Sequence, residues 1–135
     1  MRVRKARKTD LPQIIRLAKK CDLDYLGMES DSFWVAAEGP EVVGIVALKK
    51  HPDCAELCAL GVDEAKRLKG LGRELVLALL EKARGDIYLA TIIPNFFEKL
   101  GFRKAGQIPA SMVKKSDWCR DCRKDLCTVM VKSCP

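Results

Sequence analysis

Residues 62–73 decide the fold, and their sequence is Val62-Asp63-Glu64-Ala65-Lys66-Arg67-Leu68-Lys69-Gly70-Leu71-Gly72-Arg73. They join an apolar stretch typical of a strand to an amphipathic helix pattern over residues 70–83. The first turn of a helix has backbone N–H groups without intrahelical partners and carries the positive end of the helix dipole. Glycines let a phosphate approach these groups, and the basic side chains of the segment add full charge. The segment predicts a phosphate-binding turn; the alternative is a glycine-containing helix start with a solvated basic face.

The pattern on either side of this turn alternates between strands and helices. Strands are predicted at residues 3–6, 33–37, 42–48, 54–62, 87–91, 102–108 and 126–131, and helices at residues 9–21, 70–83 and 94–101. Residues 22–31 are either a short second helix or a loop, and Thr9 and Asp10 are expected to cap the first helix. This order predicts a mixed α/β architecture with one central sheet. We find no internal repeat and no linker, so residues 1–135 are expected to form one domain, with a cysteine-rich segment and a last strand at residues 109–135.

The composition, with 48% hydrophobic and 32% charged residues, is that of a soluble globular protein. No apolar run approaches the ~20 residues of a membrane helix, and the charged N-terminus has no apolar stretch behind it. We therefore expect no membrane segment, no secretory signal and a cytoplasmic location. The net charge of +7 is suited to nucleic acid or to a polyanionic small molecule, and it also serves simple solubility.

A second motif, Asn95-Phe96-Phe97-Glu98-Lys99-Leu100-Gly101-Phe102, follows the predicted strand at residues 87–91. Together with Arg67-x-x-Gly70-x-Gly72, it resembles the GNAT (Gcn5-related N-acetyltransferase) superfamily. The pyrophosphate loop of that family has the pattern Arg/Gln-x-x-Gly-x-Gly/Ala, after the fourth strand and at the start of the third helix. The resemblance covers residues 2–109. It implies a GNAT fold, with a mixed, mostly antiparallel sheet of six to seven strands, about four helices, and fourth and fifth strands that splay apart.

The resemblance also implies acetyl-CoA as cosubstrate. Main-chain groups at Leu60, Gly61 and Val62 would pair with the pantetheine arm, which lies between the splayed strands in the family. The other residues expected at the cofactor are Arg67, Leu68, Lys69, Gly70, Leu71, Gly72 and Arg73 at the pyrophosphate, and Asn95 and Phe97 near the arm. A helix cap is the alternative for Asn95, and a place in the core is the alternative for Phe97.

The family reaction is direct attack of a neutral amine on the thioester, which needs a proton acceptor. Glu56, on the predicted fourth strand, is the candidate base, because several GNAT enzymes have a glutamate there; the alternative is a solvent-facing strand residue. His51 precedes Pro52 in a predicted hairpin loop and is expected to be exposed. Phe97 stands where many members have the tyrosine that protonates the thiolate, which leaves the general acid open.

The C-terminal cysteines Cys119, Cys122, Cys127 and Cys134 lie close together. Cys-x-x-Cys spacing is common in zinc sites, but a disulfide and unligated thiols are equally consistent with a run this short. We therefore predict no metal. In GNAT folds this segment borders the acceptor pocket.

The expected function is transfer of acetyl from acetyl-CoA to a primary amine of a small molecule or an amino acid. The stretch Ile108-Pro109-Ala110-Ser111 and the cysteines after it are similar to those of short N-acetylglutamate synthase-like members, which suggests an amino-acid acceptor. The alternatives are a non-catalytic acyl-CoA-binding module, supported by Phe97, and a protein N-acetyltransferase. We do not expect nucleic acid as a partner, because no basic helix or aromatic array accompanies the charge. The sequence leaves a homodimer open, as dimers are frequent in the family.

Overall fold

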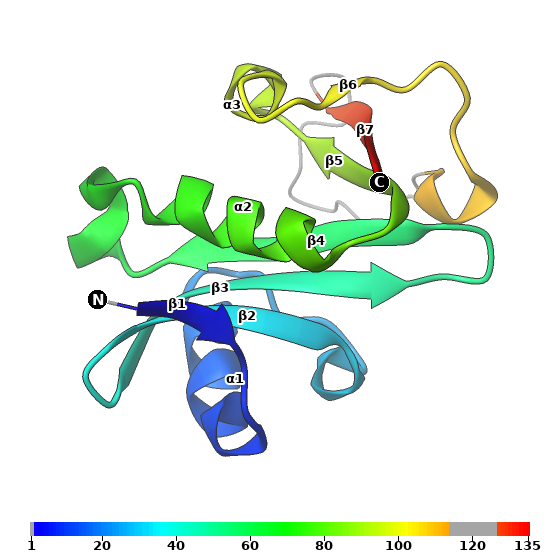
Figure 1. Cartoon of the computed structure of the whole chain (residues 1–135). Coiled ribbons are helices and arrows are strands. Elements are labelled where there is room, and N and C mark those ends of the chain that lie inside the picture. Colours follow the sequence, from blue (N-terminus) through cyan, green and yellow to red (C-terminus); the bar gives the residue numbers. More distant parts are fainter. Residues whose placement is uncertain (1, 114–126) are drawn as a thin grey trace. The chain divides into compact units, whose positions relative to one another are not determined.

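The structure is a computed structural model that describes residues 2–113 and 127–135, apart from the side chains of residues 68 and 69 (Figure 1). Its contacts form two compact units, each made of two separate stretches of chain. The first unit comprises Met1–Lys49 and Leu57–Ala83, and the second comprises Lys50–Glu56 and Arg84–Pro135. The strand that carries Glu56 therefore contributes to both units.

The described residues form seven strands, and the order in which these are hydrogen-bonded is β1-β2-β3-β4-β5-β7-β6. They are β1 (Arg2–Lys5), β2 (Ser32–Glu38), β3 (Glu41–Lys50), β4 (Ala55–Val62), β5 (Gly85–Thr91), β6 (Arg103–Lys104) and β7 (Thr128–Cys134). β4 and β5 pair in parallel, whereas β1–β2, β2–β3, β5–β7 and β6–β7 are antiparallel. The prediction of a mixed, mostly antiparallel sheet is confirmed.

Three α-helices occur in the described part of the chain, rather than about four: α1 (Leu11–Lys20), α2 (Leu71–Lys82) and α3 (Pro94–Glu98). Residues 22–31 form no second α-helix, only the 3₁₀ turn η2 (Met28–Ser30), which follows Gly27 in the left-handed conformation. The other 3₁₀ turns are η1 (Lys8–Asp10), η3 (Glu64–Lys69) and η4 (Ala110–Met112). None of the helices described is long and apolar enough to cross a membrane.

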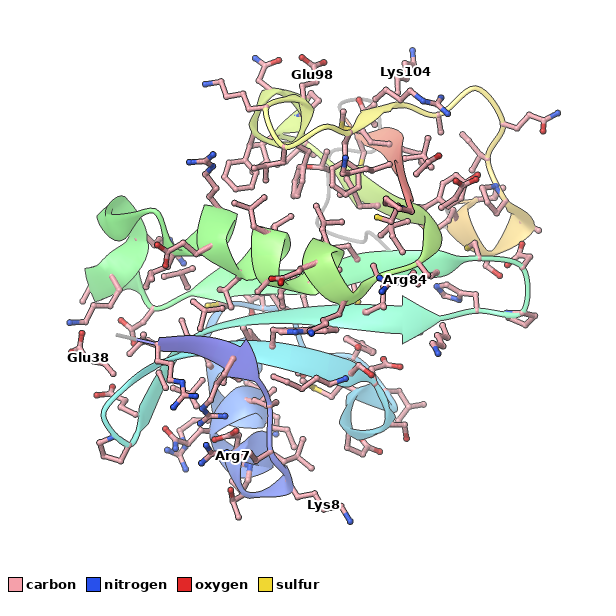
Figure 2. All side chains as sticks on the ribbon, viewed as in Figure 1. Arg7, Lys8, Glu38, Arg84, Glu98 and Lys104 are labelled. Atoms are coloured by element: carbon pink, nitrogen blue, oxygen red, sulfur yellow. The ribbon has the colours of Figure 1, made fainter. Side chains whose placement is uncertain are left out.

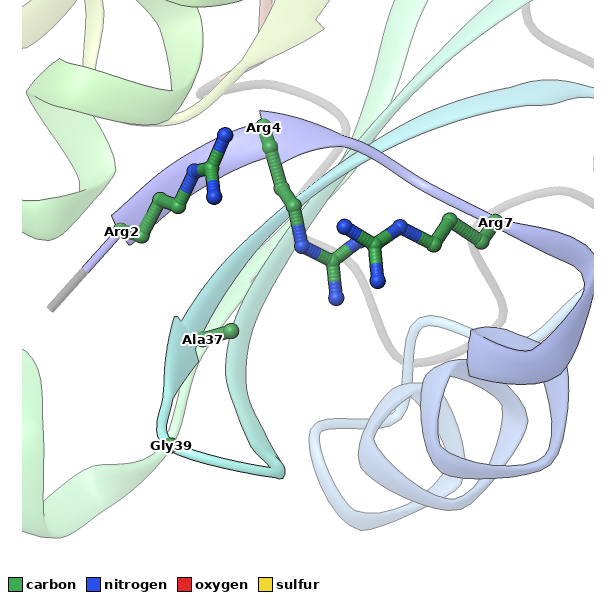
Figure 3. A pocket seen from close by; sticks show the side chains of 5 residues that line it. All are labelled: Arg2, Arg4, Arg7, Ala37 and Gly39. Carbon is green, nitrogen blue, oxygen red and sulfur yellow. The ribbon is translucent and has the colours of Figure 1, made fainter.

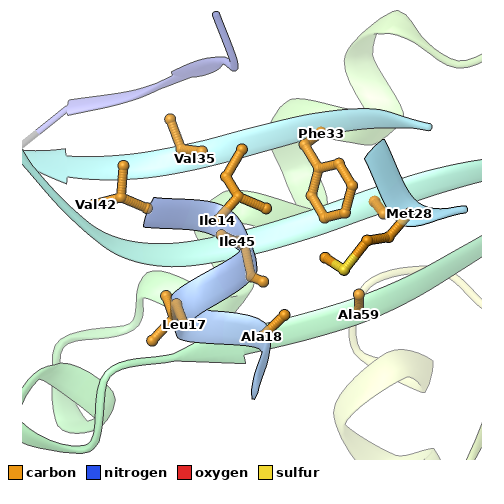
Figure 4. Packing of buried hydrophobic residues seen from close by; sticks show 10 residues of the cluster. Ile14, Leu17, Ala18, Met28, Phe33, Val35, Val42, Ile45 and Ala59 are labelled. Carbon is orange, nitrogen blue, oxygen red and sulfur yellow. The ribbon is translucent and has the colours of Figure 1, made fainter. Parts of the chain in front are cut away.

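One face of the first unit is covered by α1. Ile14, Leu17 and Ala18 recur at helical spacing and are buried against strand residues that include Val35 and Ile45 (Figure 4). This apolar stripe is the reason why the segment forms a surface helix whose polar side faces solvent. The periodicity of Leu11, Ile14, Ile15 and Ala18 predicts the helix, but Leu17 is buried where Leu11 and Ile15 are only half-buried.

The opposite face of the same unit is covered by α2, which contacts β1 and β2 and places Leu75 against Gly44 of β3 (Figure 1). Leu75 is fully buried, and its Cδ1 lies 2.9 Å from the place that a Cβ on Gly44 would occupy. The Cβ of Ala36 lies 3.3 Å from the same place. A side chain at residue 44 would therefore meet packed neighbours on two elements.

Replacing Gly44 with Ala is expected to lower the free energy of unfolding by about 1–3 kcal/mol, because the added methyl overpacks the contact with Leu75. Urea denaturation measures the change. Gly106→Ala is the control, since a Cβ there has no neighbour within 4 Å, and it should alter stability by less than about 1 kcal/mol. Equal stability of the two variants would contradict the close packing of α2 on β3.

Asp10 is the N-cap residue of α1, as the sequence predicts, but its side chain makes no cap hydrogen bond to that helix. Its buried carboxylate accepts hydrogen bonds from Arg4 Nη1 at 2.7 Å, from Arg4 Nη2 at 3.1 Å and from the backbone N–H of Arg7 at 2.7 Å. It thus closes η1 and joins it to β1. The Arg4 guanidinium brings a full positive charge and two hydrogen bonds to the carboxylate, whereas a helix cap offers only neutral backbone N–H donors. The hydrogen bond from Arg4 and then that from Arg7 hold the pKa of Asp10 below its ordinary value, against the opposing effect of burial.

This carboxylate makes stability depend on pH. Because the pKa of Asp10 is lower in the folded than in the unfolded chain, its stabilisation is present above about pH 4 and is lost as the pH falls through the folded-state pKa. Asp10→Asn is expected to lower the free energy of unfolding at pH 7 by about 1–3 kcal/mol, and by less at pH 3. Denaturation at both pH values tests this, with the exposed Asp24→Asn as control. A loss for Asp10→Asn that is equal at both pH values would contradict the ion pair.

The second unit is built around β5, which pairs with β7 along its whole length from Gly85↔Cys134 to Thr91↔Thr128. Its core contains Ile87, Leu89, Phe97, Phe102, Met112 and Met130. Two strand predictions were wrong in extent. The strand predicted at residues 102–108 forms only as β6, because Gly106 and Pro109 follow it closely, and Pro109 has no N–H to donate. The last strand continues to Cys134 because polar Lys132 and Ser133 still pair with Ile87 and Asp86.

Candidate functional site

The turn between β4 and α2 has the predicted glycine at the start of the helix. Gly70 is the N-cap of α2 and adopts a left-handed backbone, with φ +72°. The sequence did not predict that the residues before it form the 3₁₀ turn η3. Asp63 begins that turn, since its side chain accepts a hydrogen bond from the N–H of Ala65 at 3.1 Å. The chain thus passes from β4 through the 3₁₀ turn η3 and then directly into α2.

The first turn of α2 has N–H groups that lie before the first hydrogen bond of the helix. The N–H of Glu74 bonds to the carbonyl oxygen of Gly70 at 3.2 Å, which is the first hydrogen bond of the helix. The N–H groups of Leu71, Gly72 and Arg73 precede it, so helix geometry gives them no intrahelical acceptor. Together with the helix dipole, they can receive an anion.

Two basic side chains near this turn, those of Lys66 and Arg67, form hydrogen bonds with other groups of the chain. Arg67 donates from Nε to the carbonyl oxygen of Val62 at 3.1 Å, which ties the turn to the end of β4. The Lys66 ammonium lies 2.9 Å from the carboxylate of Glu38, which is labelled at the end of β2 in Figure 2, and this partner raises the pKa of Lys66. The exposed Arg73 lies in the first turn of α2 itself.

The backbone of β4 is irregular just before the predicted pantetheine contacts at Leu60, Gly61 and Val62. Ala59 has φ +52°, a left-handed conformation that is rare for a residue with a side chain and recurs in bulges near functional sites. A Cβ on Gly61 would lie 2.6 Å from Leu23 Cδ1 and 3.4 Å from Cys21 Sγ, so side chains approach this glycine closely. The irregular residue is Ala59, and its identity gave no signal in the sequence.

Glu56 is bonded to the only histidine of the chain. The Nε2 atom of His51 lies 2.7 Å from Oε1 of Glu56, and the two side chains are only 13% and 15% exposed. The expectation that His51 is an exposed loop residue is therefore wrong. The N–H of His51 bonds to the carbonyl oxygen of Cys54 at 2.8 Å and closes the β3–β4 hairpin, which brings residues 51 and 56 onto facing arms. Counting residues across the hairpin turn could have suggested this pair.

The hairpin that carries the pair also contains Asp53 and Cys54. Burial, together with the neighbouring carboxylates of Asp53 and Glu56, raises the pKa of the Cys54 thiol to about 11. Ser111 in η4 hydrogen-bonds Asp53, its N–H donating at 3.1 Å, and lowers the pKa of that carboxyl. Glu56 is in parallel register with Tyr88 of β5.

The two candidate residues of α3 have different environments. Phe97 is buried and makes edge-to-face contacts with Phe96 at 4.9 Å and with Phe102 at 5.7 Å between ring centroids. Its ring is part of the core of the second unit, as the alternative interpretation held. Asn95 is exposed in the first turn of α3, and its contact with the cofactor stays a prediction.

Comparison with known proteins decides the family. The model of the acetyltransferase (GNAT) family matches residues 4–102. The chain belongs to the GNAT family. The resemblance inferred from the two motifs is confirmed, and acetyl-CoA is the cosubstrate of this family, as predicted.

Relatives of this GNAT chain include N-acetyltransferase 8F1 of Mus musculus, which is 30% identical over 120 residues, covering 78% of this chain and 51% of the relative. N-acetylaspartate synthetase of Rattus norvegicus is 33% identical over 93 residues, covering 61% of this chain and 31% of the relative. The chain thus spans about half of the length of the first relative and about a third of the second. In fold it is similar to N-acetylglutamate synthase from Neisseria gonorrhoeae, solved with coenzyme A and N-acetyl-glutamate, at a TM-score of 0.72 and 20% identity, over 97% of this chain and 34% of that one.

The described residues of this GNAT chain include only two of the four C-terminal cysteines. Cys119 and Cys122 lie outside the described residues. Cys127 is half-buried and Cys134 is buried at the end of β7, and neither forms a disulfide. Within residues 2–113 and 127–135, no group of three or more His, Cys, Asp or Glu side chains is arranged to hold a metal ion.

A concavity of about 370 Å³ on the first unit is lined by Arg2, Arg4 and Arg7, with Ala37 and Gly39 (Figure 3). Arg4 is bonded to Asp10, whereas the other two arginines are exposed. Arg2 and Arg4 lie on β1 and Arg7 follows it, and β1 is the first strand in the order of the described sheet, next to β2. Charged side chains on an edge strand prevent pairing with other chains. This accounts for part of the positive charge without a ligand.

Proposed function

We propose that the chain transfers acetyl from acetyl-CoA to the primary amino group of an amino acid by direct attack of the amine on the thioester. The observation that carries the proposal is the largely buried Glu56 carboxylate, held by His51 at 2.7 Å on β4. A carboxylate removed from water is suited to accept a proton from an amine. A solvated strand glutamate, the alternative interpretation, would be far more exposed.

The cofactor residues supply the other parts of the reaction. The N–H groups of Leu71, Gly72 and Arg73 are proposed to bind the pyrophosphate of CoA, since helix starts bind phosphate. Main-chain groups of residues 60–62, which follow the left-handed Ala59, are proposed to pair with pantetheine and to donate to the oxyanion. Because Phe97 has no proton to give, we propose that the thiolate leaves without a side-chain acid.

An acidic amino acid is the proposed acceptor. The relative named N-acetylaspartate synthetase and the structural neighbour solved with N-acetyl-glutamate both point to a dicarboxylic amino acid. The net charge of +7 attracts such a substrate through long-range electrostatics. We also propose that the two units act as one catalytic domain, because β4 contributes residues to both.

Thiol release from acetyl-CoA over a panel of amines tests the proposal. L-aspartate or L-glutamate is expected to give a kcat/KM about tenfold or more above that of neutral and basic amino acids. Faster release with peptides carrying a free N-terminus would instead indicate a protein N-acetyltransferase. Saturable CoA binding without release on any amine would indicate the non-catalytic acyl-CoA-binding module. The cytoplasmic location and the homodimer stay predictions of the sequence.

A further inference from the structure

We propose that Lys49 recognises the side-chain carboxylate of the acceptor, and that the ring of Tyr25 positions the Lys49 ammonium for this contact. The inference deepens the proposed function, acetyl transfer to an acidic amino acid, and rests on it. Lys49 lies near the end of β3, and Tyr25 lies in the segment between α1 and η2. Neither residue belongs to the two sequence motifs.

Contacts within the first unit fix the place of Tyr25. Its hydroxyl donates a hydrogen bond to Oδ2 of Asp31 at 2.5 Å and accepts a weaker one from Sγ of Cys58, on β4, at 3.8 Å. The side chain also packs against the hydrophobic cluster that contains the buried residues of α1. Burial, and then the hydrogen bond with Asp31, raise the pKa of Tyr25, so the hydroxyl keeps the proton that it donates. The ring is thus tied to β4 and to the start of β2.

The ammonium of Lys49 lies over this ring, with Nζ 4.6 Å from the ring centroid. The negative face of an aromatic ring attracts a cation but leaves its charge uncompensated. Lys20 and Lys66 each have a carboxylate partner, whereas among the described residues no carboxylate forms an ion pair with Lys49. Because the Lys49 side chain is only half-buried, an anion from outside the chain can reach the ammonium.

The residue of β4 that contacts Tyr25 shares a face of this strand with the proposed base. Residues two apart on a strand point to the same face, and Cys58 is two residues after Glu56. The left-handed Ala59 follows both residues, so it does not interrupt the alternation between them. The two positions are roughly 7 Å apart along the strand. The amino group and the side-chain carboxylate of an acidic amino acid are only a few bonds apart, so their partners must lie on one such face.

A single cation at this place selects acidic acceptors. Every amino acid has an α-carboxylate, so recognition of that group does not distinguish acidic from neutral acceptors. Asparagine and glutamine have nearly the shape of aspartate and glutamate but no charge on the side chain. A lysine that binds the side-chain carboxylate therefore favours the acid over its amide, and loss of the lysine removes this preference.

The test is the acid-to-amide ratio, defined as kcat/KM for L-aspartate over that for L-asparagine, and likewise for L-glutamate over L-glutamine. Lys49→Met removes the ammonium and keeps the apolar length of the side chain. It should lower kcat/KM for the acids about 10–100-fold and that for the amides less than about threefold, since hydrogen bonds to charged groups are strong. Lys49→Arg keeps the charge and should retain part of the preference.

The matched control is Lys5→Met. The Lys5 ammonium is also held over an aromatic ring, 4.7 Å from the ring centroid of Trp34, and its loss changes the net charge of +7 by the same amount. These two residues lie on β1 and β2, neither of which adjoins β4 in the strand order. The acid-to-amide ratio should therefore stay as in the wild type. Tyr25→Leu removes the ring beneath Lys49 and should lower the ratio about 3–10-fold, whereas Tyr25→Phe keeps the ring and should lower it less.

The outcomes separate this assignment from the proposed function. An acid-to-amide ratio that is the same in the wild type and in Lys49→Met overturns the role of Lys49 and leaves the proposed function standing. Equal losses for acids and amides overturn that role as well. A wild type that acetylates acids and amides equally well overturns both the acidic acceptor and the role of Lys49, but not acetyl transfer.

If the wild type acetylates no amine, the proposed function fails, and calorimetry in the presence of CoA tests Lys49 without turnover. N-acetyl-L-aspartate should bind the wild type about tenfold or more tightly than N-acetyl-L-asparagine does, and Lys49→Met should bind the two equally. Equal binding of the two compounds to the wild type overturns the role of Lys49.

Discussion

Glu56→Gln is expected to lower kcat by about 10²–10⁴-fold with the best amine acceptor, because the amide keeps the size of the side chain but cannot take a proton. The amide oxygen can still accept a hydrogen bond from His51, so the hairpin should keep its geometry. KM for acetyl-CoA should change little, since the predicted cofactor contacts are made by other residues. Steady-state kinetics under saturating acetyl-CoA give both values.

The control for this change is Glu29→Gln, which makes the same chemical substitution at an exposed residue of η2. It should retain full activity. A reduction of less than about threefold for Glu56→Gln would remove Glu56 as the base, and the direct-attack mechanism would then need a water chain as proton acceptor. A large loss with both variants would indicate that the unfolded fraction, and not the chemistry, had changed.

Gly72→Ala is expected to weaken the binding of CoA by about 10–100-fold, because a methyl group in the first turn of α2 keeps the pyrophosphate away from the N–H donors. The same change should leave the folded state as stable or raise its stability by about 0.5–1 kcal/mol, since alanine is favoured over glycine within a helix. Loss of affinity together with unchanged or increased stability would therefore identify a steric effect on the ligand. Calorimetry and urea denaturation measure the two quantities.

Gly70 is less suitable for this test. Its φ of +72° would strain any side chain, so that a loss of affinity in Gly70→Ala would combine backbone strain with steric exclusion. Gly106→Ala, at a position with open space around a Cβ, is the matched control and should bind CoA as the wild type does. Unchanged affinity in Gly72→Ala would mean that the phosphates lie elsewhere.

The sequence predicts what depends on local spacing. The periodicity of Leu11, Ile14, Ile15 and Ala18 predicted α1, and of these Ile14 and Ala18 are buried. The glycine spacing predicted the helix start at Gly70. The family resemblance confirmed by comparison was also carried by short contiguous motifs. These features are set by hydrogen-bonding geometry and burial within a few residues, so that a single sequence contains them in full.

Features that depend on non-local contacts were missed. The bond between His51 and Glu56 forms only when the hairpin closes, and a proline next to the histidine argued for an exposed loop. Asp10 has the position of a helix cap, but its carboxylate binds the guanidinium of Arg4 on β1 instead. The left-handed Ala59 had no signal at all, because alanine is not a residue that favours this conformation.

The contact between Gly44 and Leu75 also limits how the family can vary at these two positions. The space between β3 and α2 is shared, so a larger residue at one position requires a smaller one at the other. The double substitution Gly44→Ala with Leu75→Val should recover part of the stability that Gly44→Ala loses alone. Among homologous chains, the summed side-chain volume at positions 44 and 75 should consequently vary less than the volume at either one, so the two positions should co-vary.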